Sequence, residues 1–292
     1  MPNKVIVVTG ATSGIGKALA VDLAKSAETV VIVARDADRG NATLGEIRSA
    51  AQNPNIDLQL GDLSTLSSVR NLAEILKSKY ETIGVLINNA SVYKRQRAVT
   101  VDGFEEMFAA NHLGPFLLTN LILENLQAAV EVNRSARVLN ITAPSSVPLN
   151  FDDLQGARNF SSLNAFGATK MANLLFTFEL ARRLENTGIN VNAIHPGLAR
   201  SGLMKEAFFL MRLLTRLASS PPEKVTGAIL QAALAPEFEN TTGKFLHHGK
   251  EIEAPAYAHD RDAQQRLWEI SEQLTGLAAT KGVTPVNDPH LK

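Results

Sequence analysis

The stretch that decides the fold is Val5-Ile6-Val7-Val8-Thr9-Gly10-Ala11-Thr12-Ser13-Gly14-Ile15-Gly16. Its β-branched beginning predicts a buried strand, and the periodicity after Gly16 predicts a helix. Between them Gly10 allows a tight turn, Gly14 lets the backbone approach a pyrophosphate, and Gly16 lets the helix pack closely on the strand. Strand, glycine turn and helix in this order favour a dinucleotide site at the helix N-terminus. The spacing is Gly-x-x-x-Gly-x-Gly rather than the commoner Gly-x-Gly-x-x-Gly.

Strand and helix patterns alternate along the rest of the chain. Apolar runs predict strands over residues 5–8, 28–34, 56–60, 83–87, 136–141 and 188–194. Helical patterns cover 38–52, a helix from an N-cap at Ser64 to about 79, one long helix over 103–130 with a kink at Gly114-Pro115, and 164–185. Further helices are expected near 205–218, 222–234 and 261–274, and a last short strand near 243–246. This alternation predicts one α/β domain with a doubly wound, mostly parallel sheet of the Rossmann type.

The composition excludes several classes of protein. The chain has 292 residues, of which 45% are hydrophobic, and its 29 Lys and Arg balance 29 Asp and Glu. A neutral chain is not held on nucleic acid by bulk electrostatics, so we expect no nucleic-acid partner. Without cysteine it has no disulfide, thiolate nucleophile or zinc–thiolate site, and we expect no metal. No signal-peptide pattern and no apolar run of membrane-spanning length occur, which predicts a cytoplasmic protein without a membrane span.

The end of the second predicted strand bears on the choice of cofactor. An acidic residue here usually binds the ribose hydroxyls, whereas arginine accommodates a 2′-phosphate. Arg35 occupies the discriminating position and Arg39 follows closely, so we favour NADP over NAD. The alternative is that Asp36 holds the ribose while Arg35 is a solvated strand-end residue. Asp62-Leu63 ends the third strand at the same edge, where the carboxylate either accepts from an adenine amino group or caps a helix.

Short amide side chains follow the fourth strand. Asn89 and Ala90 suit a backbone that runs close to a bound adenosine, and an ordinary Asn-Asn turn is the alternative. Asn111 lies in a helix, where asparagine is unfavourable, so a kink or a buried packing role is expected. His112 has no metal-ligand partner nearby and is interpreted as structural. Tyr93, just after the turn, is interpreted as a surface-loop residue.

In these motifs the chain resembles the short-chain dehydrogenase/reductase family, in particular its retinol-dehydrogenase and carbonyl-reductase-like branch. The matching motifs are Thr9–Gly16, Ala34-Arg35-Asp36, Gly61–Ser64, Asn88-Asn89-Ala90, Asn111–Gly114, Thr169-Lys170 and His195-Pro196-Gly197. Together with the reasoning above, the resemblance implies cofactor contacts from Gly10, Thr12, Ser13, Gly14, Ile15, Gly16, Arg35, Arg39, Asp62, Leu63, Asn89, Ala90, Lys170, Pro196 and Gly197.

The catalytic positions implied by the resemblance depart from the family pattern. The family has a tyrosine four residues before the lysine and a serine after the fifth strand, and these positions hold Phe166 and Ala143. Asn111 and Lys170 remain. Phenylalanine cannot supply the proton that accompanies hydride transfer, a contribution of about 10² to 10⁴ in rate. Ser145 is the first candidate to replace the missing proton donor. The other candidates are the hydroxyl groups of Ser146, Thr142 and Tyr93, and a proton that Lys170 passes through a water molecule.

Three explanations of these substitutions stay open. The protein is an NADP(H)-dependent reductase or dehydrogenase of a hydrophobic carbonyl or alcohol compound with a rewired proton route. Alternatively, it is an NADP(H)-binding relative that performs non-redox chemistry, such as isomerisation or cyclisation, or sensing. The third explanation is an engineered inactive variant of an ordinary reductase.

The substrate side is less defined by the sequence. The resemblance places a lid over the substrate at about 198–220, and its residues 203–217 are apolar with three basic side chains. The same segment could be a core-facing helix, or a subunit or membrane-surface contact. We expect the domain to cover 1–277, with a C-terminal tail over 278–292. Homo-oligomerisation is expected from the resemblance alone.

Overall fold

The computed structural model describes residues 4–26, 29–197, 221–222 and 225–277. The strands are β1 Val5–Thr9, β2 Thr29–Ala34, β3 Ile56–Leu60, β4 Val85–Asn88, β5 Ala136–Ile141, β6 Ile189–His195, β7 Lys244–His247 and β8 Lys250–Glu251. The helices are α1 Gly14–Lys25, α2 Ala37–Ala51, α3 Leu66–Lys79, α4 Glu106–Phe108, α5 Gly114–Leu121, α6 Leu123–Asn133, α7 Ser162–Arg183, α9 Thr226–Leu234 and α10 Arg261–Thr275, with a π-helical turn Ala109–Leu113 and 3₁₀ turns Pro236–Phe238 and Ala256–His259.

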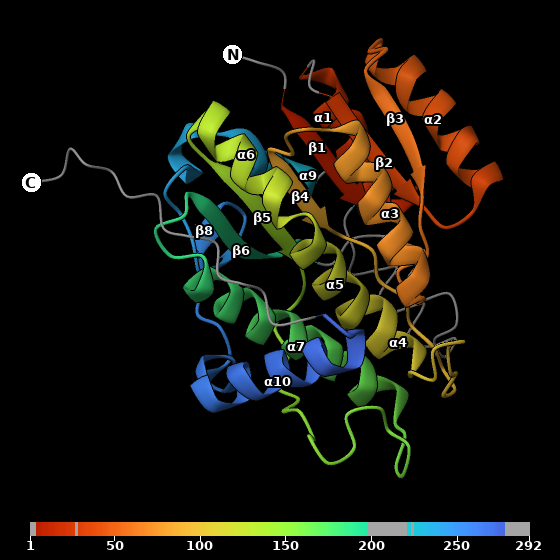
Figure 1. The fold of residues 1–292 in the computed structure, drawn as a ribbon, viewed down its shortest axis with the longest axis vertical. Coiled ribbons are helices and arrows are strands. Elements are labelled where there is room, and N and C mark those ends of the chain that lie inside the picture. Colours follow the sequence, from red (N-terminus) through yellow and green to blue (C-terminus); the bar gives the residue numbers. More distant parts are fainter. Residues whose placement is uncertain (1–3, 27–28, 198–220, 223–224, 278–292) are drawn as a thin grey trace, which may run out of the picture.

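The strands form one eight-stranded sheet in the order β3-β2-β1-β4-β5-β6-β7-β8 (Figure 1). Neighbouring strands are parallel except for β7 and β8, which pair antiparallel. Chain order reverses between β1 and β4, and a crevice outside the carboxyl ends of the strands at such a switch point binds ligands in open α/β sheets. The predicted doubly wound, mostly parallel Rossmann sheet is confirmed.

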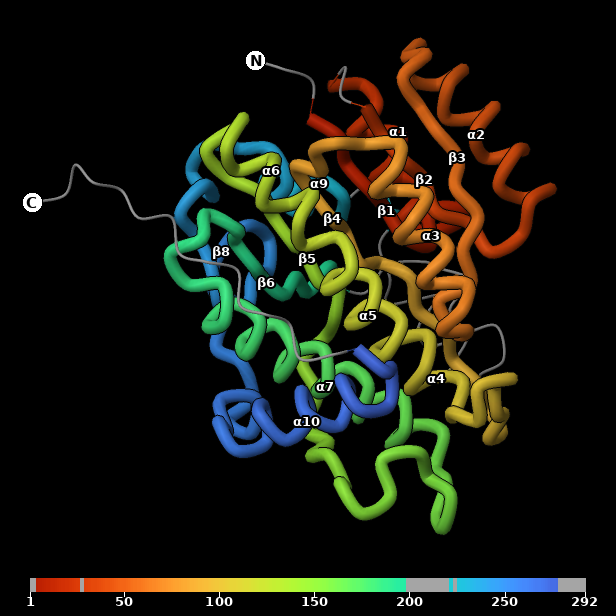
Figure 2. Tube along the Cα trace, viewed as in Figure 1, coloured from red at the N-terminus to blue at the C-terminus, as the bar shows by residue number. Residues whose placement is uncertain are grey.

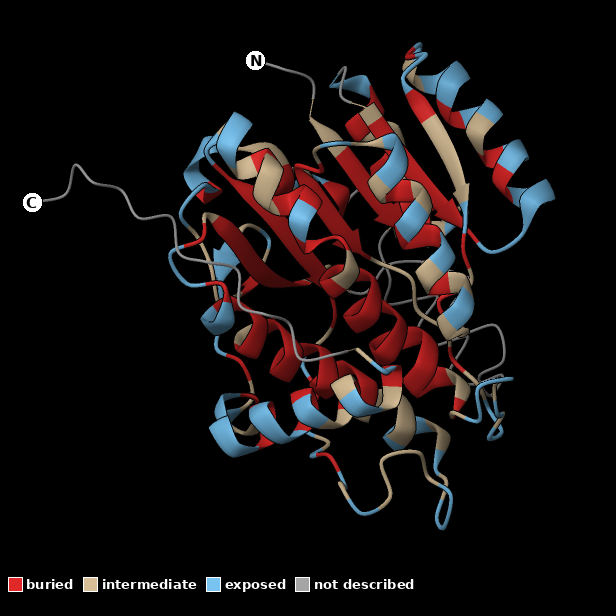
Figure 3. Cartoon of the chain, in the orientation of Figure 1, coloured by how far each residue is buried: buried red, intermediate tan, exposed pale blue. Residues whose placement is uncertain are grey.

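Helices cover both faces of the sheet because the side chains of each strand alternate between them. On one face Val7 packs with residues of α3, α5, α6, α7 and α10. On the other face Ile6 and Val8 pack with α1, α2 and α9. Helix α10 lies beside α7 (Figure 2). Figure 3 shows that α5 and α7 are largely buried, whereas the outer sides of α2 and α10 are exposed.

The prediction of one long helix over 103–130 is wrong. The chain forms α4, the π-helical turn, α5 and α6, with a break at Ile122. Glu105 caps α4 by accepting from the Phe108 amide at 2.7 Å, so the helix begins later than predicted. The π-helical turn ends immediately before Gly114. Pro115 has no amide hydrogen for the regular helical bond, which explains an irregular turn at this point.

Two smaller predictions also fail. Ser64 does not cap α3: the N-cap residue is Thr65, while the Ser64 amide and hydroxyl both donate to Asp62 Oδ1, at 2.9 and 2.7 Å. The antiparallel strand β8 has no counterpart among the predicted elements. It consists of two exposed charged residues, Lys250 and Glu251, which carry no apolar pattern.

Some expectations cannot be compared with the structure. The predicted helix near 205–218, the lid at 198–220 and the tail over 278–292 lie outside the described residues. In the described part of the chain, no helix combines the length and the apolar character needed to cross a membrane.

Candidate active site

The glycine turn after β1 has the backbone geometry that its sequence predicts. Gly10 and Gly14 have φ of 66° and 54°, in the left-handed region that glycine adopts without strain. A Cβ at Gly10 would lie 2.7 Å from the Ala90 backbone, and one at Gly16 would overlap the Asn89 amide. The glycines therefore let the turn and the start of α1 pack against the end of β4.

Thr9 and Asn89 tie the ends of β1 and β4 together across the switch point. Thr9 Oγ1 accepts from the Asn89 and Ala90 amides at 3.0 and 3.1 Å. In return, Asn89 Nδ2 donates to the carbonyls of Thr9 and Gly10, at 2.9 and 3.2 Å. The Asn89 side chain is thus occupied in holding the glycine turn.

The residues that follow β2 are exposed and contact different partners. Asp36 caps α2, because its carboxylate accepts from the Arg39 amide at 2.8 Å. The Arg39 guanidinium reaches back to Thr12 Oγ1 at 3.5 Å, which brings it beside the glycine turn. Arg35 is exposed at the same edge. The Arg39 guanidinium therefore borders the turn, while the Asp36 carboxylate caps α2.

The residues after β3 stabilise a turn. Asp62 Oδ1 accepts both hydrogen bonds from Ser64, and Leu63 is buried. A Cβ at Gly114 would overlap the Leu63 carbonyl, so α5 packs directly on this turn. The geometry gives Asp62 a turn-stabilising role, and its contact with adenine stays a prediction.

Asn111 sits in the π-helical turn and holds the segment after β4. Its Oδ1 accepts from the Val92 amide at 2.7 Å, and its Nδ2 donates to the Val92 carbonyl at 2.9 Å and to Thr169 Oγ1 at 3.2 Å. Of the two expectations for Asn111, the structure agrees with the buried packing role, because the side chain is buried within a π-helical turn. The neighbouring His112 is fully buried against Ser271 Oγ at 2.8 Å, and burial lowers its pKa to about 3, so it is a neutral structural residue as predicted.

Lys170 lies in α7 at 7% exposure. Its ammonium donates to Ser91 Oγ at 3.0 Å and lies 4.9 Å from the centroid of the Phe166 ring, one helical turn earlier. Burial lowers the pKa of Lys170 to about 8. Ser91 did not stand out in the sequence. The only local signal was a hydroxyl directly after Asn-Asn-Ala.

The hydroxyl groups of Tyr93 and Thr142 donate to local partners. The interpretation of Tyr93 as a surface residue is wrong: it is 3% exposed, packs edge-on against Phe166 at 5.6 Å between centroids, and its phenol donates to Ser162 Oγ at 3.1 Å. Thr142 Oγ1 donates to the Lys170 carbonyl at 3.0 Å. Packing against α4 and the start of α7 explains why Tyr93 is buried.

The positions after β5 present one methyl group and one buried hydroxyl. Ala143 is half-buried, and Ser145 is buried. The Ser145 hydroxyl accepts from the Val147 amide at 3.2 Å and lies beside Gly167 in α7. Because a serine hydroxyl that accepts still has its own proton, Ser145 retains a donor.

His195-Pro196-Gly197 closes β6 at the same edge of the sheet. The His195 ring stacks on His247 at 4.6 Å, and burial lowers the pKa of His195. Gly197 has a φ of 81° and is followed by residues outside the described part. Pro196 and Gly197 therefore lie where the chain leaves the sheet.

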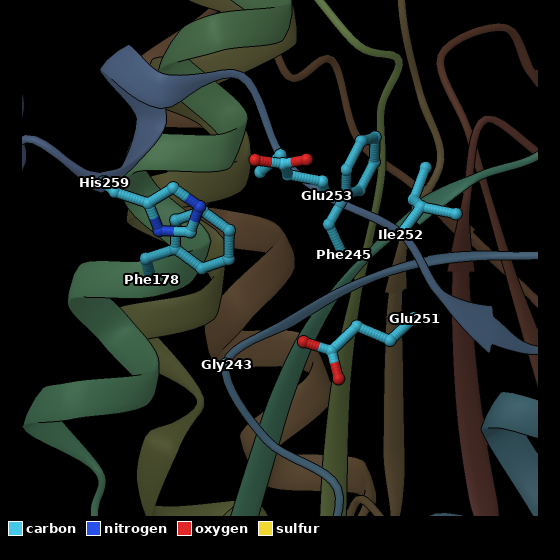
Figure 4. A pocket seen from close by; sticks show the side chains of 8 residues that line it. Phe178, Gly243, Phe245, Glu251, Ile252, Glu253 and His259 are labelled. Carbon is cyan, nitrogen blue, oxygen red and sulfur yellow. The ribbon is translucent and has the colours of Figure 1, made fainter.

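A separate surface pocket of about 340 Å³ lies at the β7–β8 edge of the sheet. Figure 4 shows its lining, with the His259 ring stacked on Phe178 and two carboxylates, Glu251 and Glu253. No residue of the predicted site contributes to it.

The reversal of strand order beside a glycine turn defines a Rossmann-type α/β protein, and a buried lysine lies at the same edge of the sheet. The chain belongs to the short-chain dehydrogenase family, which matches residues 4–209. The predicted family is thus confirmed.

Named relatives extend over nearly the whole chain. Mouse retinol dehydrogenase 12 is 38% identical over 95% of this chain and 88% of its own. Human polyprenol dehydrogenase is 33% identical over 94% of this chain and 86% of its own.

Solved structures agree with this membership. An uncharacterized protein from Mycobacterium paratuberculosis has a TM-score of 0.69 and 31% identity, covering 94% of this chain and 93% of its own. The 3-ketoacyl-(acyl-carrier-protein) reductase of Brucella melitensis, complexed with NADH, has a TM-score of 0.67 and 25% identity, covering 84% and 96%. The chain is therefore an oxidoreductase of the short-chain dehydrogenase type, a family that uses nicotinamide cofactors.

Proposed function

We propose that the protein is an NADP(H)-dependent oxidoreductase that interconverts a hydrophobic carbonyl compound and its alcohol, with an atypical proton donor. The observation that carries this proposal is the buried Lys170 amine at the edge of the sheet that also bears the glycine turn. The bound cofactor would supply or accept the hydride. The residues of this chain would bind and orient the reactants and move the proton.

The glycine turn fits a dinucleotide. Ser13 makes no capping bond to α1, and the first turn of α1 has no acidic residue, so the positive end of the helix is left for an anion. We propose that Gly10, Thr12, Ser13, Gly14, Ile15 and Gly16 hold the pyrophosphate, with Asp62, Leu63, Asn89, Ala90, Pro196 and Gly197 as the other contacts along the cofactor. Lys170 and Asn111 would position its nicotinamide end.

Arg35 and Arg39 support the preference for NADP over NAD. A guanidinium binds phosphate through paired charge-assisted hydrogen bonds. One oxygen of the Asp36 carboxylate accepts the capping bond of α2, which supports the preference for arginine contacts over a ribose held by Asp36. We therefore expect tighter binding of NADPH than of NADH.

Calorimetry with both nucleotides tests this preference. Arg35→Ala should weaken NADPH binding at least tenfold, because a hydrogen bond to a charged group contributes about 1.5–3 kcal/mol, and should leave NADH binding unchanged. Arg261→Ala, at the exposed start of α10, is the matched control. Equal affinity of the unaltered protein for both nucleotides would refute the preference.

The residues at the catalytic positions make the proton route atypical. Phe166 and Ala143 carry no hydroxyl, and the Tyr93 phenol is bonded to Ser162. We propose that Ser145, whose hydroxyl retains its donor, polarises the substrate oxygen, and that Lys170 stores the exchangeable proton. Its lowered pKa suits proton exchange near neutral pH.

The names of the relatives support a long apolar substrate. Retinol and polyprenol are hydrophobic alcohols, which agrees with the apolar character of residues 203–217 in the proposed lid. Oxidation of NADPH in the presence of hydrophobic aldehydes and ketones tests the reaction. Binding of NADPH without turnover of any of them would instead favour non-redox chemistry or sensing, the second candidate that Phe166 and Ala143 support.

The cellular setting belongs to the same proposal. We propose a cytoplasmic protein with a domain over 1–277 and a tail over 278–292, assembled as a homo-oligomer in keeping with the resemblance to its family. Cell fractionation tests the location, and light scattering of the purified protein tests the assembly.

A further inference from the structure

The segment after β4 is held at both ends, which fixes the place of Ser91. On one side Thr9 Oγ1 accepts from the Ala90 amide at 3.1 Å. On the other side the Asn111 side chain bonds both the amide and the carbonyl of Val92, at 2.7 and 2.9 Å. Ser91 lies between these two clamps, so its hydroxyl is placed by the fold.

The Ser91 hydroxyl is the hydrogen-bond partner of a buried ammonium. Ser91 Oγ accepts from Lys170 Nζ at 3.0 Å, and across from it the ammonium faces the Phe166 ring. Within residues 4–26, 29–197, 221–222 and 225–277, no carboxylate pairs with Lys170 and no acceptor takes the Ser91 proton. A hydroxyl that accepts from lysine keeps its own O–H for another acceptor.

The titratable groups on the elements packed around Lys170 are turned to other partners. His112 in the π-helical turn faces Ser271 and is neutral. His195 at the end of β6 stacks on His247. Glu179, farther along α7, is ion-paired with Arg182 and Arg183. Among the described residues, Ser91 is the side chain that hydrogen-bonds Lys170 Nζ and so offers a route for its proton.

We propose that Ser91 is a further catalytic residue, whose hydroxyl gives its proton to the substrate oxygen and regains one from Lys170. This inference rests on the proposed function. It assigns to Ser91 and Lys170 the proton transfer for which Phe166 has no phenol.

The transfer balances in the direction of reduction. The bound cofactor would supply the hydride for the new C–H bond, and the π electrons of the carbonyl would move to its oxygen. That oxygen bonds the Ser91 proton while Ser91 Oγ takes a proton from Lys170 Nζ. The products are the alcohol, the oxidised cofactor and a neutral Lys170 amine, which a proton from water restores.

The pair can be tested without cofactor or substrate. NMR of protein with isotopically labelled lysine follows the titration of Lys170, whose signal is assigned by its loss in Lys170→Met. Ser91→Ala should lower the titration midpoint by about one pH unit, because it removes the acceptor that stabilises the charged form. Ser162→Ala removes a similarly half-buried hydroxyl of α7 and should leave the midpoint unchanged. An unmoved midpoint in Ser91→Ala would overturn the pairing.

Turnover tests the proton transfer itself. With NADPH and a reducible aldehyde, Ser91→Ala should lower kcat about 100-fold and shift the pH profile, with NADPH affinity retained, whereas Ser91→Thr should keep most of the rate. Equal kcat in the unaltered protein and in Ser91→Ala would refute the catalytic role of Ser91 but leave the proposed function standing. If the unaltered protein binds NADPH but reduces no aldehyde, the proposed function fails and the transfer fails with it, while the NMR result still reports on the pair.

Discussion

Replacing Lys170 by methionine should stabilise the protein at neutral pH. The ordinary lysine pKa of 10.5 falls to about 8 on burial, and each unit corresponds to about 1.4 kcal/mol, so the folded state carries a penalty of about 3 kcal/mol while the ammonium is charged. Methionine has a similar length and no charge to desolvate. The gain in stability from methionine is reduced because the Ser91 hydroxyl loses the hydrogen bond that it accepts from Lys170.

The stability difference between Lys170→Met and the unaltered protein should depend on pH. Between about pH 8 and 10.5 the unfolded chain retains a proton that folded Lys170 has released, so the free energy of unfolding of the unaltered protein rises with pH. The advantage of Lys170→Met should therefore shrink by about 3 kcal/mol across this window. Below pH 8 it should be constant.

Urea unfolding at a series of pH values measures the difference between the two proteins. Lys244→Met, which removes an exposed ion pair with Glu251, should change stability by less than about 1 kcal/mol. A stability difference between Lys170→Met and the unaltered protein that does not change from pH 7 to 10.5 would show that Lys170 is not desolvated as the geometry requires.

Three further outcomes follow from the site and its packing. Phe166→Tyr combined with Ala143→Ser should raise aldehyde reduction by about 10² or more, and unchanged turnover would argue against carbonyl-reductase geometry in the cleft. Gly114→Ala should lower the free energy of unfolding by about 1–3 kcal/mol because of the overlap with a backbone carbonyl, whereas Gly45→Ala, with open space around it, should be neutral or stabilising in thermal or urea unfolding. Tyr93→Phe should lower stability by about 1 kcal/mol with little change in steady-state rate, and a large loss of rate would make its phenol the proton donor.

Local sequence patterns were enough to predict strands β1 to β7, whereas β8 was missed. The β-branched runs and the glycine turn are signals carried by adjacent residues, and a doubly wound, mostly parallel sheet follows from how such units wind. The break in the predicted helix over 103–130 depends on distant contacts. Asn111 bonds Val92, and α5 packs on Leu63, pairings that no short stretch of sequence reveals.

The same distinction applies to the site. The spacing of Phe166 and Lys170 placed them on one helix face, and the structure brings ring and ammonium within 4.9 Å. Ser91 and Lys170 meet across 79 residues of sequence, so their bond could not be predicted from either motif alone. Tyr93 was misjudged for the same reason, because its burial comes from Phe166 and Ser162 in α7.

The position of Lys170 is hard to explain by stability. An ammonium buried without a carboxylate among the described residues is unfavourable, and an apolar side chain of similar length would fit the core better. Yet Asn111 and Thr9 clamp the segment that presents Ser91 to this ammonium. Such restraint at a destabilising residue is expected where the residue itself does chemistry. On the proposed function, the absence of a phenol at Phe166 would change which group passes the proton to the substrate, while Lys170 would still store it.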